Sequence, residues 1–157
     1  MDHNERIMHW TDQHLSELSQ LDDETGVEIM KACGKACCEL SELYDGALRL
    51  SREHLPDEDI DRVYEKFKQE YYSEGKMTKT GDIITLIFES CTCPLVKRGT
   101  SHAFLCNCTT GYTERLFEVL FNRKVTVDLE QSILKGDRIC KQSIYIQEEQ
   151  ATDPPNQ

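Results

Sequence analysis

The spacing of apolar residues changes near Gly81, and this change is the strongest constraint on the fold. Over residues 1–72, apolar side chains recur every three or four positions, as in helices that bury one face. After Gly81, apolar and polar residues alternate in short segments bounded by Gly, Asp or Pro, as in strands. The sequence therefore predicts an α+β fold, in which an N-terminal helical layer (1–72) packs on a mostly antiparallel sheet formed by residues 82–146.

Four helices are predicted in the first half, and the second of them is the best marked. It runs from about Thr25 to Tyr44, and its apolar residues follow steps of three and four: Ile29, Cys33, Cys37, Leu40 and Tyr44. This stripe predicts that Cys33 and Cys37 fill the core. Cys38 falls off the stripe and is interpreted as a simple thiol.

The remaining boundaries follow from turn residues. Asp45 and Gly46 predict a break before a short third helix at residues 47–54, and Pro56 predicts the start of a fourth helix. In the second half, four segments have the character of strands: 83–89, 101–108, 124–129 and 139–146. One amphipathic helix is inserted between the second and third strands. Residues 1–147 are predicted to be one domain, and residues 148–157, with two consecutive prolines, a loose tail.

The net charge of the chain limits the classes of partner that we expect it to bind. Eighteen Lys and Arg against 29 Asp and Glu leave a net charge of −11, which argues against nucleic acid and against an anionic membrane surface as partners. The longest apolar run, residues 83–88, is too short to span a membrane. The first residues do not resemble a signal peptide, so we expect a cytoplasmic protein whose thiols stay reduced.

The eight cysteines are the residues most suggestive of chemistry. Two C-x-C pairs stand out, Cys91 with Cys93 and Cys106 with Cys108, and Cys140 follows them. In a reducing compartment, such cysteines indicate metal or redox chemistry more often than disulfides. If both pairs lie on paired strands, the four thiols converge on one face of a hairpin, and thiols are ligands for Zn²⁺. Residues two apart on a regular strand are roughly 6.5 Å apart, so a site that takes one sulfur from each of several segments is an equal alternative. The alternative interpretation is that the thiols are buried as small apolar groups.

Three further residues form a second tier of metal candidates. Cys33 and Cys37 lie one helical turn apart, a spacing at which two side chains reach one ion, and His102 precedes the second C-x-C pair. The chain contains no phosphate loop, nucleophile elbow or H-E-x-x-H motif, so no catalytic residue is predicted. The acidic residues from Asp57 to Asp61 are interpreted as a solvated helix start.

Part of the second half resembles a known family. The segment from Cys106 to Tyr112, the helix after it, and the segment from Val125 to Cys140 with its Gly-Asp turn resemble the 4-vinyl reductase domain. The likeness covers about residues 82–146, and Ser-Ile-Leu-x-Gly-Asp-x-x-Cys is its most specific part. With Cys33-Gly-Lys-Ala-Cys and Cys91-Thr-Cys-Pro added, the whole chain looks like a group of uncharacterised cysteine-rich bacterial and archaeal proteins.

The resemblance implies an α+β fold that binds a small hydrophobic or aromatic ligand, commonly as a homodimer. In sensor members of that family, three cysteines and a glutamate hold zinc. The first and last cysteine fall on Cys106 and Cys140, but the glutamate falls on Leu129 and the middle cysteine on Ser132. Additional cysteines are available to replace the two missing ligands: Cys91, Cys93 and Cys108. The candidate ligand-binding residues are the aromatic Phe104 and Tyr112.

Three functions are compatible with these observations. The first is a sensor-type, small-molecule-binding module with a cysteine-ligated metal, expected to be zinc. The second is a metal- or cysteine-dependent enzyme, a hydrolase or a reductase, which needs an open metal position or a low-pKa thiol. The third is a thiol redox sensor. For the first, we expect Cys106 and Cys140 to share one site with at least one other cysteine of the C-x-C pairs.

Overall fold

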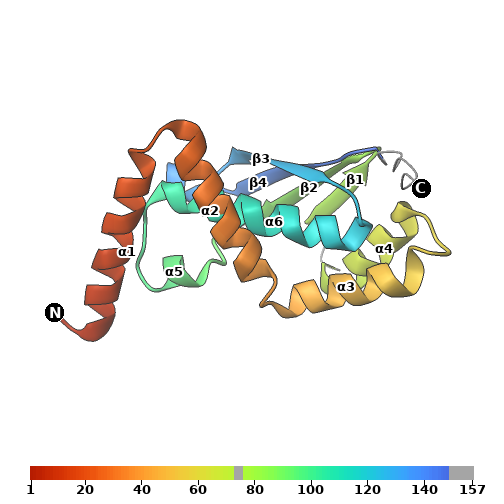
Figure 1. Ribbon diagram of the computed structural model, residues 1–157, viewed down its shortest axis with the longest axis horizontal. Coiled ribbons are helices and arrows are strands. Elements are labelled where there is room, and N and C mark those ends of the chain that lie inside the picture. The colour runs from red at the N-terminus through yellow and green to blue at the C-terminus, as the bar shows by residue number, and fades with distance from the viewer. Residues whose placement is uncertain (73–75, 149–157) are drawn as a thin grey trace, which may run out of the picture.

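The computed structural model, which describes residues 1–72 and 76–148, has the predicted α+β architecture (Figure 1). Its helices are α1 (His3–Ser19), α2 (Asp23–Cys38), α3 (Glu42–His54), α4 (Ile60–Tyr71), α5 (Pro94–Lys97) and α6 (Cys106–Phe121), with short 3-10 turns η1 (Ala103–Leu105) and η2 (Ile133–Lys135). Its strands are β1 (Met77–Thr80), β2 (Ile83–Phe88), β3 (Val125–Gln131) and β4 (Cys140–Ile146). Apart from residue 148, the predicted tail lies outside the described residues.

The sheet is antiparallel throughout, with the strand order β1-β2-β4-β3. Helix α6 lies along one face of the sheet, and α2 and α3 lie on the other side of α6 (Figure 1). The buried residues Ile84, Val127 and Ile144 are paired across three strands and share one face. Thr113 of α6 donates a hydrogen bond of 2.7 Å to Gln142 on the same face. Since alternate strand residues share a face, Cys140 also faces α6.

Helices α2 and α6 touch backbone to backbone. A Cβ atom added at Gly34 would lie 1.9 Å from the carbonyl oxygen of Cys108. One added at Gly111 would lie 2.2 Å from the carbonyl oxygen of Lys31. Beside this crossing, Lys31 Nζ lies 2.9 Å from the buried carboxylate of Glu114. The crossing therefore depends on glycine at two positions and is flanked by an ion pair.

The predicted break in the first half lies in the wrong place. Helix α2 ends at Cys38 rather than Tyr44, and α3 begins after Ser41, whose Oγ accepts the Tyr44 N–H at 3.2 Å. Gly46 lies inside α3. Glycine is needed at this position because the Tyr71 side chain occupies the space that a Cβ atom would fill. Its role is close packing between α3 and α4, and a sequence pattern alone does not separate this role from a helix stop.

The predicted buried face of α2 is wrong as well. Its buried face lies about 100° around the helix axis from the predicted apolar stripe. The buried residues are Gly26, Met30, Gly34 and Cys38. Leu40 is 90% exposed, Cys33 and Cys37 are exposed, and Cys38 is fully buried in the core. The cause is the glycine contact with α6, since the closest helix approach occurs where side chains are smallest and hydropathy carries no signal.

Two boundaries in the middle of the chain also differ from prediction. Helix α4 begins at Ile60, where Asp59 caps it by accepting the Arg62 N–H, and Pro56 lies in the preceding turn. The polar strand β1 was not predicted. It pairs with β2 through a two-residue turn in which Gly81 has a φ of +59°, a conformation that favours glycine and hairpin formation.

The predicted strand at 101–108 is wrong, and this error matters most for the site. These residues form η1 and the first turn of α6, and the His102 Nδ1 accepts the Phe104 N–H at 3.3 Å to cap η1. A short apolar run such as residues 103–106 fits a helix as well as a strand, so periodicity does not decide between them. The predicted strands at 83–89, 124–129 and 139–146 are confirmed within a few residues at their ends.

Three core groups predict how stability depends on alkaline pH. Burial raises the pKa of Cys38 from 9.0, and of Tyr64 and Tyr72 from 10.0, to about 12 in each case. In the unfolded chain these groups ionise at their ordinary pKa values, so their contribution to the free energy of unfolding is complete below about pH 9 and is lost towards pH 12.

We therefore expect the melting temperature of the reduced, metal-free protein to fall steadily above about pH 9. Thermal unfolding followed by circular dichroism between pH 7 and 11 measures this, and tyrosinate absorbance in the folded protein serves as the control. A melting temperature that stays constant up to pH 11 would contradict the burial of these groups.

Candidate functional site

The first turn of α6 separates the two cysteines of the second C-x-C pair. On a helix, residues two apart point in directions that differ by roughly 200° around the axis. Cys106 and Cys108 therefore have different neighbours, whereas the predicted hairpin would have placed them on one face. The expected convergence of four C-x-C thiols on a single face is wrong for this reason.

Cys106 lies between α6 and the sheet, in what we call the inner thiol group: Cys91, Cys106 and Cys140. The Cys106 side chain is buried, and its Sγ lies 3.1 Å from the hydroxyl of Ser132, itself fully buried. The next residue, Ile133, donates its N–H to Cys140 Sγ at 3.4 Å. Two thiols from α6 and β4 therefore contact the same two-residue segment at the start of η2.

The Cys106 thiol has a raised pKa. Burial raises the pKa of the Cys106 thiol, and the nearby thiols of Cys140 and Cys91 raise it further, while the Ser132 hydrogen bond and Lys135 oppose the rise. With a raised pKa the thiol stays protonated at neutral pH. Without a metal to replace the proton, Cys106 is therefore a weak nucleophile.

Cys108 is the centre of a second set, the outer thiol group: Cys33, Cys37, Cys93 and Cys108. Burial raises the pKa of Cys108 to about 12, and the thiols of Cys37, Cys93 and Cys33 add to the rise, in that order. Cys93 and Cys108 pack against one satellite apolar cluster, whose buried members are Leu15, Met30 and Leu105. Cys33 and Cys37 lie on α2 and are exposed.

Each C-x-C pair thus contributes one thiol to each group. Cys91 belongs to the inner group with Cys106, and Cys93 belongs to the outer group with Cys108. The segment after β2 and the first turn of α6 therefore take part in both groups. A shift of either segment would move a thiol in each group at once.

Both groups offer the donor set that zinc prefers, because their donors are thiols. In the described ranges 1–72 and 76–148, no three Cys, His, Asp or Glu side chains converge closely enough to hold an ion as they stand. Rotation between staggered χ1 rotamers swings a cysteine Sγ without moving the backbone. The fit to zinc therefore rests on donor chemistry and on which backbone segments are neighbours.

The two predicted ligand-binding aromatics lie in different environments. Phe104 packs against the satellite cluster, near α2. Tyr112 packs against the main core, and its hydroxyl donates a 2.9 Å hydrogen bond to Ser41. The structure therefore keeps Phe104 close to the thiols but assigns Tyr112 a role at the α2–α3 junction. His102, whose Nδ1 caps η1, is a candidate ligand only through Nε2.

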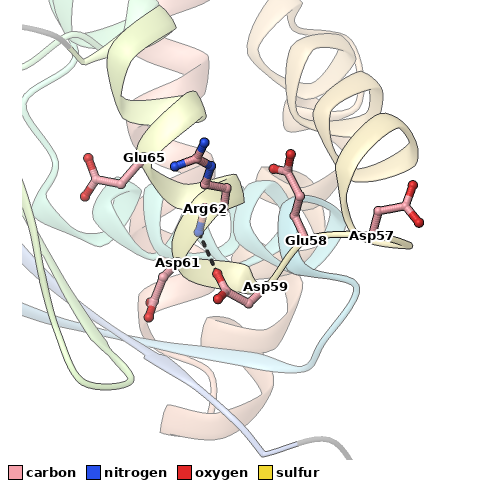
Figure 2. A pocket seen from close by; sticks show the side chains of 6 residues that line it. All are labelled: Asp57, Glu58, Asp59, Asp61, Arg62 and Glu65. Atoms are coloured by element: carbon pink, nitrogen blue, oxygen red, sulfur yellow. Dashed lines mark hydrogen bonds between the residues drawn. The ribbon is translucent and has the colours of Figure 1, made fainter.

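A hollow of about 420 Å³ at the start of α4 has a different chemistry (Figure 2). Five carboxylates and one guanidinium line it: Asp57, Glu58, Asp59, Asp61, Glu65 and Arg62. In Figure 2 the carboxylates point in different directions, and the one dashed contact is the helix cap between Asp59 and the Arg62 backbone. It contains no thiol and no predicted site residue, in agreement with a solvated helix start.

No helix in the described part of the chain is long and apolar enough to cross a membrane.

Sequence comparison identifies the family of the chain. No curated protein matches the sequence. The likeness to the 4-vinyl reductase domain stays a prediction. The sequence pattern of DUF6144, a family of unknown function, matches residues 1–151, which include all eight cysteines. The chain therefore belongs to the DUF6144 family.

Proposed function

We propose that this protein is a small-molecule-binding module of the sensor type that holds zinc at the inner thiol group. The observation that carries the proposal is the position of Cys106, whose thiol contacts Ser132 while Cys140 accepts the N–H of the next residue, Ile133. The thiols of Cys140 and Cys91 also contribute to the raised pKa of Cys106. Three thiolates leave one of the four zinc positions open. That position would take a donor atom from a small ligand.

The spatial arrangement supports the likeness on which the proposal also draws. Cys106 and Ser132 are 26 residues apart in the chain yet lie 3.1 Å from each other, and Cys140 is adjacent. These are the three positions at which the resembled sensors carry cysteine ligands. Since Ser132 has no thiol, Cys91 supplies the third one in this proposal.

The surroundings of the inner group favour a ligand with a small apolar or aromatic body. Leu134 follows the Ser132 segment directly and packs against the satellite cluster together with Phe104, Leu95 and Val96. A ligand bound to the metal would extend along these side chains. Zinc supplies affinity for a donor atom such as sulfur or nitrogen, and the apolar residues supply selectivity. The proposed setting is the reducing cytoplasm, and a homodimer stays a prediction.

Elemental analysis of protein purified without added metal tests the zinc part of the proposal. Cys140→Ser and Cys106→Ser are each expected to lose about one zinc ion per chain relative to the wild type. Cys38→Ala is the matched control, because Cys38 is buried in the core and belongs to neither thiol group. Unchanged zinc content in both serine variants would refute the inner site. A peroxide-induced disulfide in metal-free protein would instead favour the redox sensor.

The open position has its own test. In Co²⁺-substituted protein, added imidazole is expected to bind the inner site and change the visible spectrum, since a three-thiolate ion accepts a fourth ligand. The change should disappear in Cys140→Ser. A spectrum that is insensitive to imidazole would mean that the site is closed and would contradict a ligand-binding role.

A further inference from the structure

We infer that Cys33, Cys37, Cys93 and Cys108 form a second metal site, a closed four-thiolate site for zinc that joins α2 and α6 to the segment after β2. Four thiolates are the donor set of closed structural zinc sites. This inference does not depend on the inner site, because the two thiol groups have no cysteine in common.

The first step of the argument is the contact between α2 and α6. The α carbon of Gly34 lies against the carbonyl group of Cys108, so close that a Cβ atom there would clash at 1.9 Å. Cys33 and Cys37 flank Gly34 and lie one helical turn apart, on one side of α2. The two helical turns that carry these thiols therefore lie directly beside Cys108.

The second step is the segment that follows β2. Pro94 occupies the first turn of α5, and Cys93 immediately precedes it. Cys93 packs against the same satellite cluster as Cys108, and that cluster also contains Leu15 of α1 and Met30 of α2. Figure 1 shows α5 beside α2, on the side towards α1. The fourth thiol thus reaches this cluster from a segment that belongs to neither α2 nor α6.

The third step is the exposure of Cys33 and Cys37. Free cysteine is among the residue types most often buried, so two exposed cysteines one turn apart need a reason. Neither thiol makes a hydrogen bond within the described residues, so both are free to rotate towards Cys93 and Cys108. A zinc ion would replace the protons of these four thiols and hold the three segments together.

The experiment compares zinc content and thermal stability in the full chain. Wild-type protein is expected to hold about two zinc ions, and the double variant Cys33→Ser/Cys37→Ser about one. Because both positions are exposed, the metal-free variant should melt within about 2 °C of metal-free wild type. Free zinc at roughly 1,000 times the Kd should raise the wild-type melting temperature by about 10 °C, and that of the variant by less.

Alkylation supplies a second readout. In metal-free protein, iodoacetamide is expected to label Cys33 and Cys37, and zinc should protect both, as peptide mass analysis would show. Full labelling in the presence of zinc, or unchanged zinc content in the double variant, would overturn the inference. Cys38→Ala on the same helix should leave the zinc content and the labelling pattern unchanged. Loss of zinc only in Cys140→Ser would support the inner site alone, and loss only in the double variant would support this site alone.

Discussion

Replacing Gly34 with alanine is expected to lower the melting temperature of the protein by about 2–12 °C. The new Cβ atom would lie 1.9 Å from the Cys108 carbonyl oxygen and 2.8 Å from the Tyr112 backbone nitrogen. Both atoms belong to the backbone of α6, so no side-chain rotation relieves the clash. Overpacking costs about 1–3 kcal/mol and occasionally more, and each kcal/mol corresponds to about 2–4 °C for a chain of this size.

Thermal unfolding monitored by circular dichroism measures the effect. Glu28→Ala, at an exposed position of the same helix, is the control and should change the free energy of unfolding by no more than ~0.5 kcal/mol. In an isolated helix, alanine is more favourable than glycine by about 1 kcal/mol. Stabilisation by Gly34→Ala would therefore show that α2 and α6 are further apart than described.

Replacing Ser132 with cysteine is expected to strengthen zinc binding at the inner thiol group by about 100-fold or more. The hydroxyl of Ser132 lies 3.1 Å from Cys106 Sγ, so a thiol at this position adds a fourth donor next to an existing one. Structural four-ligand zinc sites bind with about 10–16 kcal/mol, or roughly 3 kcal/mol per ligand. Such a difference corresponds to about two orders of magnitude in Kd.

Competition with a chromophoric chelator measures the Kd of the inner site, with the outer site removed by the Cys33→Ser/Cys37→Ser change. Ser143→Cys is the matched control, since Ser143 is also buried on the sheet but faces away from α6. The control should leave the Kd unchanged. An equal Kd for Ser132→Cys and the parent protein would exclude this segment from the metal site. The fourth thiolate should also abolish the response to imidazole, because it closes the site.

The sequence predicted strands correctly where one face of the strand is buried, because apolar and polar residues then alternate along the chain. Val125 and Val127 face the core while Thr126 and Asp128 face outward, and β3 forms where this pattern predicts it. The same reasoning failed at residues 101–108, because the run before Cys106 is too short to distinguish the periods of helix and strand. That single error placed Cys106 and Cys108 on one face of a hairpin rather than on two sides of a helix.

The sequence indicated the cysteines as candidate site residues, but it did not indicate how they divide into the inner and outer thiol groups. The spacing of the cysteines and the resemblance selected Cys106 and Cys140 as neighbours, and the structure brings both to Ser132 and Ile133. Cys33 and Cys37 were assigned to the core because hydropathy counts apolar side chains. Glycine has no side chain to count, so the contact of Gly34 with α6 left no signal in that pattern.

The sequence by itself determined the order and type of most elements, because helix and strand periods are properties of neighbouring residues. It also marked the cysteines as the candidate site residues. Only the tertiary structure decided which thiols meet, because contacts between α2, α6, β4 and the segment after β2 join residues far apart in the chain. The closeness of Gly34 to Cys108 placed α2 beside one cysteine of a C-x-C pair, whereas Cys106, the other, contacts the Ser132–Ile133 segment that Cys140 also contacts.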